Sequence, residues 1–245
     1  GSDTLDRTVD LASLIDLACL DLWTGRADHD LNVRCWRPRT SGGLWRWVLF
    51  DMDLWAPAND RTVQRFCGEA APGTPYVPQL LAHTDTRDRL LARMAALLAT
   101  TLSADRAKLL ADSLYGLYCE AMLADHERWQ AEMDIPSPKA AYADLMEHVD
   151  GRATVMMEQL SAQTGKKVRE LNVTVDPPHA GTVSVEDLPL TDVQRGVQVF
   201  SDVQMHFTAL SAPGMEFAGW KGGDGNGTSI SIAITRDASI KAMFR

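Results

Sequence analysis

Two aspartates at the end of an apolar run are the first residues whose spacing suits chemistry. Asp51 and Asp53 lie two residues apart after the stretch LWRWVLF, which begins at Leu44. Its aromatic and β-branched residues predict a buried or half-buried strand. Because residues i and i+2 of a strand point to one side, both carboxylates can face one site. Two carboxylates suit a hard cation such as Mg²⁺, and the alternative is an ordinary Asp-containing turn at a strand end.

A second polar cluster precedes this run. Asp28, Asp30 and Asn32 lie in a polar turn, and a short alternating segment and a glycine-containing turn follow, which predicts a β-hairpin over about residues 33–53. The start of one hairpin strand adjoins the end of its antiparallel partner, so both clusters can converge on one pocket. Phosphoryl transfer uses such a set, with one Asp to orient a hydroxyl and an Asn and a second Asp to hold Mg²⁺. An Asp-rich turn capping a hairpin is the structural alternative.

Helical periodicity dominates the rest of the first two thirds of the chain. It predicts helices over residues 10–23, 86–102, 104–130 and 138–165, with Ser103 and Ser137 as N-caps and a long irregular loop over 56–86. At residues 165–167 the pattern changes to strand-length alternation, which continues to Phe244. The predicted fold class is therefore α+β, with a mostly helical domain, residues 3–165, that includes the hairpin, and a small all-β domain, residues 168–245.

Composition narrows the functional classes. The formal net charge of −9 and the pI near 5.1 argue against a general nucleic-acid or anionic-membrane surface. We find no apolar run long enough to span a bilayer, so no transmembrane segment is expected. The four cysteines are widely spaced and are expected to be buried free thiols. His126 and His148 are isolated on amphipathic helices, where we expect surface or capping positions.

Residues 10–57 resemble the CotH family of bacterial spore-coat kinases and their relatives, which are atypical protein kinases. The resemblance is carried by the segments DLWTGRADHDLN and GGLWRWVLFDMDL. The resemblance implies a kinase-like C-terminal lobe, a Ser/Thr protein substrate, and ATP with Mg²⁺ or Mn²⁺ as cofactors. The resemblance implies that Asp28 is the catalytic aspartate and that Asn32, Asp51 and Asp53 are ligands of the metal ion. It also implies that Trp45 and Trp47 form the aromatic strand beside the cofactor.

Three departures from the family pattern accompany the resemblance. Arg26 stands where the family usually has Asn, the spacing from Asp28 to Asn32 is one residue shorter, and Ala56 and Pro57 replace the usual aromatic-Gly pair. Only 27 residues precede Asp28, too few for a nucleotide-covering lobe with its phosphate-contacting Lys. We therefore expect either the C-terminal part of a longer kinase, inactive by itself, or a degenerate relative that keeps the scaffold.

The last 78 residues carry a second resemblance. Their pattern is similar to the internalin-B-type B-repeat of bacterial extracellular proteins at Pro213, Gly214, Phe217, Gly219, Trp220, Ile240, Ala242 and Phe244. Phe217, Trp220 and Phe244 are expected to be core aromatics. The two resemblances together imply an exported protein at the bacterial cell surface or outside the cell. The alternative function is a non-catalytic extracellular scaffold or adhesion module.

Overall fold

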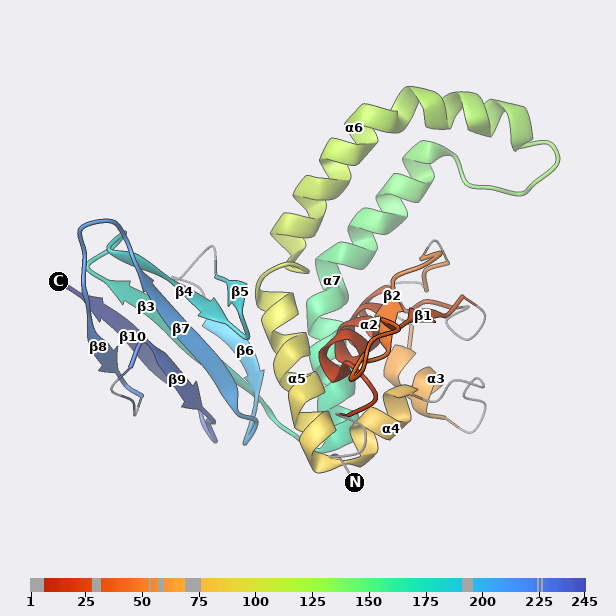
Figure 1. Ribbon diagram of the computed structural model, residues 1–245. Helices are drawn as coiled ribbons and strands as arrows, with labels where there is room; N and C mark the ends of the chain where they lie inside the picture. Colours follow the sequence, from red (N-terminus) through yellow and green to blue (C-terminus); the bar gives the residue numbers. More distant parts are fainter. Residues whose placement is uncertain are drawn as a thin grey trace.

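The computed structural model of the chain contains a helical part and a strand part that lie side by side (Figure 1). It describes residues 7–27, 32–52, 54–56, 60–68, 76–190, 196–223, 225 and 227–245. The prediction of an α+β fold is confirmed. Within these residues, no helix has the length and apolar character needed to cross a bilayer.

The first helix, α2 (Leu11–Thr24), is the centre of the helical part. The Asp10 side chain accepts a hydrogen bond from the Ser13 backbone N–H, which caps the helix N-terminus. Gly25 ends the helix with φ +64°, a left-handed conformation that glycine adopts without strain. Most of α2 is buried against α5 (Thr84–Ala99) and α7 (Pro138–Thr164) in a core of aliphatic side chains and methionines.

The segment expected to be a loop over residues 56–86 contains two short helices, which corrects that prediction. They are α3 (Thr62–Cys67) and α4 (Tyr76–Ala82). Val63, Phe66, Val77 and Leu80 are almost completely buried, so apolar contacts with the core stabilise helices that are too short to form alone. Of the prolines that suggested a loop, Pro78 lies in the first turn of α4, and Pro57, Pro72 and Pro75 lie outside the described residues.

Two long helices form a hairpin that projects from the body (Figure 1). They are α6 (Ala104–Trp129) and α7, and both serines expected at N-caps occupy those positions. The Ser137 hydroxyl accepts from the Ala140 N–H at 3.3 Å, whereas Ser103 makes no side-chain capping bond. The helix expected over 86–102 instead covers Thr84–Ala99.

The strands β1 (Arg34–Trp36) and β2 (Arg46–Val48) form a two-stranded antiparallel pair on α2, with Cys35 opposite Trp47. The pair is shorter than the buried or half-buried strand predicted for the stretch that begins at Leu44, and of the residues of β2 Trp47 is half-buried while Arg46 and Val48 are exposed. Only one side of the hairpin meets α2, where Trp47 packs against the core. Arginine side chains lie over the rings of Trp36, Trp45 and Phe50, which partly shields the exposed aromatic faces. Cys19 is buried, but Cys35 is exposed and Cys67 and Cys119 are half-buried, so the expectation of buried thiols is correct for Cys19 alone.

The strand part is a sandwich of two four-stranded sheets. One sheet has the order β6 (Gly196–Phe200), β3 (Val168–Asp176), β10 (Ala238–Phe244) and β8 (Phe217–Lys221). The other has the order β5 (Leu188–Pro189), β4 (Gly181–Val185), β7 (Met205–Ser211) and β9 (Ser229–Ile232). The first and last of these strands, β3 and β10, pair in parallel. Phe244 is buried and contacts Phe217, which in turn contacts the Trp220 ring.

Candidate functional site

A buried ion pair lies at the C-terminal end of α2. Asp21, in the last turn of α2, forms this ion pair with Arg26: its Oδ2 accepts a hydrogen bond from Nη2 at 3.2 Å, and its Oδ1 lies 3.0 Å from Nε. The side chains are 0% and 1% exposed, respectively. The Tyr76 hydroxyl of α4 also donates to Asp21 Oδ2. Burial and the adjacent Asp21 carboxylate raise the pKa of Tyr76 well above its usual value, so this hydroxyl stays protonated and remains a donor.

Arg26 joins the two polar clusters that the sequence singled out. Its Nη1 donates to the backbone carbonyl of Asn32 at 3.3 Å and to that of Phe50 at 3.0 Å. Asn32 precedes β1, and Phe50 follows β2 and immediately precedes Asp51. One nitrogen of a buried guanidinium therefore binds both a residue that precedes one hairpin strand and a residue that follows the other.

Two further arginines fix the C-terminal end of α2. Arg152 of α7 is completely buried and donates to the carbonyls of Leu22 and Trp23 and to the Thr62 hydroxyl. Arg65 of α3 donates to the carbonyls of Gly25 at 2.7 Å and Arg26 at 3.2 Å. These donors satisfy carbonyls that the end of a helix leaves without intrahelical partners, and their charges oppose the negative end of the helix dipole. We call Arg26, Arg65 and Arg152 the arginine cluster.

Asp60 supplies a counter-charge for the cluster. Its carboxylate accepts from Arg65 at 2.9 Å and from the Thr62 hydroxyl at 2.7 Å. Burial alone would raise the pKa of Asp60, but these hydrogen bonds and the charges of Arg65 and Arg152 outweigh it and lower the pKa. Burial, together with the charge of Arg65, lowers the pKa of Arg152 to about 10 against the attraction of Asp60, so Arg152 is charged at neutral pH.

His148 is buried beside the cluster, which corrects the expected surface or capping position. Its Nε2 lies 3.0 Å from the Trp23 carbonyl, and its ring contacts the rings of Trp23 and Trp55. Burial and the nearby Arg152 charge lower the pKa of His148, so the imidazole is neutral at physiological pH. Backbone bonds from Ala27 to Leu54 and from Ala56 to Thr24 hold the chain after the hairpin against the end of α2.

Only part of the candidate site falls within the described residues. Asp51 is exposed and has φ +55°, and Asn32 is half-buried. Trp47 donates its backbone N–H to the Ser13 hydroxyl at 2.9 Å, and the Trp45 N–H donates to the Thr8 carbonyl, so both tryptophan positions attach the hairpin to α2 and the residues before it. Asp28, Asp30 and Asp53 lie outside the described residues. Among the residues that the structure describes, we find no group of three acidic, His or Cys side chains that could hold a metal ion.

Several residues of this arrangement were not identified from the sequence. Arg26 was noted only as a departure from the family pattern, and Asp21, Arg152 and Tyr76 were not singled out. One signal was present: Asp21 lies within the apolar stripe of α2, where a carboxylate needs a buried cationic partner. Its partner five residues later belongs to a loop, so helical periodicity could not have identified it.

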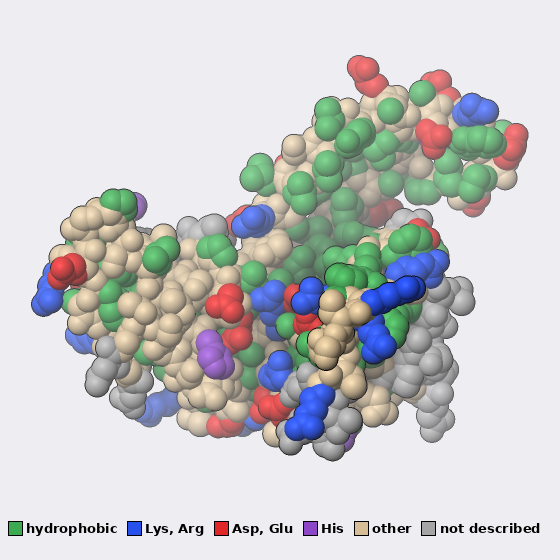
Figure 2. All heavy atoms as spheres, in the orientation of Figure 1, with side chains coloured by type: hydrophobic (Ala, Val, Ile, Leu, Met, Phe, Trp, Pro, Cys, Tyr) green, Lys and Arg blue, Asp and Glu red, His purple; other side chains and the backbone are tan. Residues whose placement is uncertain are grey.

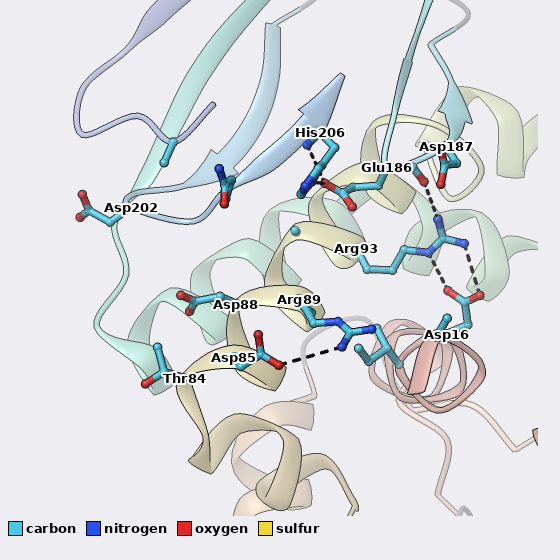
Figure 3. Close-up of a pocket in the computed structure, with 15 residues that line it drawn as sticks. Asp16, Thr84, Asp85, Asp88, Arg89, Arg93, Glu186, Asp187, Asp202 and His206 are labelled. Atoms are coloured by element: carbon cyan, nitrogen blue, oxygen red, sulfur yellow. Dashed lines mark hydrogen bonds and ion pairs between the residues drawn. The ribbon is translucent and has the colours of Figure 1, made fainter. Parts of the chain in front are cut away.

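A separate cavity of about 1200 Å³ lies between α2, α5 and the turns of the strand part (Figure 3). Arg93 of α5 forms a two-pronged ion pair with Asp16 at 2.6 and 3.3 Å and donates to the Glu186 carbonyl at 2.9 Å. The Glu186 side chain accepts from the His206 backbone N–H at 2.7 Å. These contacts connect the two parts of the chain, and the predicted site residues do not line the cavity.

Comparisons with known proteins agree with the sequence pattern of the helical part. Searches of curated proteins and of solved structures gave no match. The family model described as "CotH kinase protein" matches residues 2–156, which include α2, the hairpin, the arginine cluster and most of the α6–α7 hairpin. Because that match covers more than half of the chain, the chain belongs to the CotH kinase protein family.

Proposed function

We propose that this chain carries the metal- and phosphate-binding face of an atypical protein kinase, which transfers the γ-phosphate of ATP to Ser or Thr hydroxyls of a protein. Family membership supports kinase-like chemistry. The observation that carries the proposal is the pair of hydrogen bonds that Arg26 donates to the Asn32 and Phe50 carbonyls. It brings together the two chain segments that a phosphoryl-transfer site requires.

The roles follow from side-chain chemistry. Asn32 and Asp51 offer oxygen ligands of the kind that Mg²⁺ or Mn²⁺ prefers, and Asp51 is exposed, as a ligand that meets a nucleotide must be. We assign Asp53 as a further metal ligand and Asp28 as the group that accepts the proton of the substrate hydroxyl. When bound, the cation neutralises charge on the phosphates. Trp45 and Trp47 are assigned to the cofactor side of the hairpin.

Divalent-metal binding tests this proposal. Mn²⁺, which replaces Mg²⁺ and gives an electron paramagnetic resonance signal, is titrated into the wild-type chain, Asp51→Ala and the control Glu216→Ala. Glu216 lies before β8, in the strand part, and its side chain is 78% exposed. We expect Asp51→Ala to weaken Mn²⁺ binding at least about tenfold, the usual scale for losing a ligand-shell group, and Glu216→Ala to leave it unchanged. Equal binding by wild type and Asp51→Ala would refute the assigned site.

Phosphate transfer is then assayed on the natural full-length protein with labelled ATP, with and without Asp51→Ala. We expect metal-dependent labelling of Ser or Thr that the substitution abolishes. Metal binding without any transfer would support the alternative, a scaffold that retains the metal site without the activity. We further propose an exported, surface-associated protein in which the strand sandwich is a B-repeat-like binding module, because the family is known from spore coats.

A further inference from the structure

The outward face of α6 is apolar, and no part of the chain that the structure describes covers it. None of its 26 residues is buried. Figure 2 shows hydrophobic side chains gathered along the projecting α6–α7 hairpin. The large exposed hydrophobic residues of α6 are Leu109, Leu110, Leu114, Leu117, Tyr118, Met122 and Leu123, with Leu117 at 70% and Leu110 at 61%.

The inner face of α6 explains why the leucines point outward. Contacts with α7 are largely polar or aromatic: Lys108 pairs with Asp150, Asp112 accepts from the Tyr142 hydroxyl, and the rings of Tyr115 and Tyr142 stack at 4.3 Å. Residues 108, 112, 115 and 119 share one side of an α-helix. Residues 110, 114, 117, 121 and 124 share the opposite side, so α6 has two separate contact faces.

The outward residues have coiled-coil spacing. Leu110, Leu114, Leu117, Ala121 and Ala124 recur at alternating intervals of four and three, the a and d pattern of a heptad repeat. We call these five residues the α6 seam. Leu110, Leu114 and Leu117 are 46–70% exposed, so with the two alanines the seam presents roughly 400 Å² of apolar surface, about half of the roughly 800 Å² per partner of a standard protein interface. An apolar patch of this size marks an interaction surface.

We propose that the α6 seam pairs with the α6 seam of a second copy of this chain, in antiparallel orientation. Charge selects the orientation, because Arg106 flanks the beginning of the seam whereas Glu120, Asp125 and Glu127 flank its second half. An antiparallel pair places Arg106 of each copy beside the acidic half of the other. A parallel pair places Glu120 beside Asp125 of the other copy, and like charges there oppose association.

A groove at the base of the α6–α7 hairpin can accommodate the tip of the partner's α6–α7 hairpin, which we call its arm. This groove of about 690 Å³ continues from the start of α6 to the strand part and is lined by Leu98, Leu109, Leu190 and Val197, among others. In the antiparallel pair the tip of the partner's arm reaches this end of the seam. The tip carries Met133, which is also exposed.

The test is the mass of the chain in solution by sedimentation equilibrium, from about 1 to 100 µM. We expect a dimer, and we expect Leu110→Glu/Leu117→Glu to raise its dissociation constant at least about 100-fold because four leucines per dimer lose their apolar environment. Leu210→Glu is the matched control, since Leu210 of β7 is also 70% exposed but lies outside the seam. Circular dichroism should show unchanged helicity, because both seam leucines are already exposed in one copy.

Charge reversal tests orientation without touching the seam. Arg106→Glu should weaken the dimer, and adding Glu120→Arg and Glu127→Arg should restore it. A monomer at 100 µM, a dimer that survives Leu110→Glu/Leu117→Glu, or no response to charge reversal would overturn the proposal. A monomer that sediments with phosphatidylcholine vesicles would identify a lipid surface as the occupant and would equally overturn it.

Discussion

Replacing Asp21 by Ala should destabilise the helical part more than any other single change to its ion pairs. The substitution leaves Arg26 charged, 1% exposed, and without the carboxylate that lies 3.0 Å from its Nε. The Tyr76 hydroxyl loses the same acceptor. Breaking a buried pair by removing one partner typically costs about 3 to 5 kcal/mol, a large part of the 5 to 15 kcal/mol that stabilises a domain.

The assay is urea unfolding followed by tryptophan fluorescence. Every tryptophan except Trp220 precedes residue 165, so the signal reports mainly the helical part. The matched control is Asp85→Ala, which removes an exposed pair with Arg89 at 4.0 Å and should cost no more than about 1 kcal/mol. The double variant Asp21→Ala/Arg26→Met should be more stable than Asp21→Ala because it also removes the buried charge that has lost its Asp21 carboxylate.

Comparing the unfolding free energies of Asp21→Ala and the double variant separates the contribution of the Asp21–Arg26 charge pair from that of the rest of the site. A loss below about 1 kcal/mol in Asp21→Ala, equal to that of the control, would refute the reasoning. So would a double variant less stable than Asp21→Ala, because it would mean that the backbone contacts of Arg26 matter more than its charge pair.

Two further predictions concern groups around the same helix end. The folded-state pKa of His148 is lowered from the 6.5 of an unperturbed His, so stability should be full above that value and fall as pH drops through it; His148→Gln should flatten this dependence in unfolding measurements between pH 8 and pH 5. An unchanged slope in the variant would assign the effect to other groups. Gly25→Ala should lower unfolding stability by more than about 1 kcal/mol, because φ is +64° and the new Cβ would lie 2.7 Å from Ala56 Cβ. Gly165→Ala is its control, with φ +72° and nothing within 4 Å, and an equal loss in both would exclude the clash as the cause.

Local signals in the sequence identified much of the helical part. Ser103 and Ser137 were predicted as N-caps and occupy those positions, because capping depends on residues close in sequence. The antiparallel pairing of β1 with β2 sets Arg34 opposite Val48, and Arg26 binds the carbonyls of Asn32 and Phe50; the convergence of the acidic side chains on one pocket stays a prediction. Apolar periodicity also separated the helical region from the strand region.

The remaining features depend on contacts between distant segments. Arg152 of α7 meets the end of α2 across 130 residues of sequence in its bond to Leu22, and no local pattern encodes that contact. His148 is buried only because Trp23 and Trp55 converge on it. The aromatic content of the hairpin strand left open whether it is buried or half-buried, and the packing of α2 and of arginine side chains against part of it decides this. The parallel pairing of β3 with β10 likewise joins segments that are far apart in the sequence, so no local pattern predicts it.

The central claim is that the buried Asp21–Arg26 pair positions the hairpin end for a metal–phosphate ligand. The most direct measurement is Mn²⁺ binding, by electron paramagnetic resonance, to the Asp21→Ala/Arg26→Met variant under conditions where circular dichroism shows that it is folded. We expect binding at least about tenfold weaker than in the wild type, since no buried guanidinium then holds the Asn32 and Phe50 carbonyls. Wild-type affinity in that folded variant would contradict the claim.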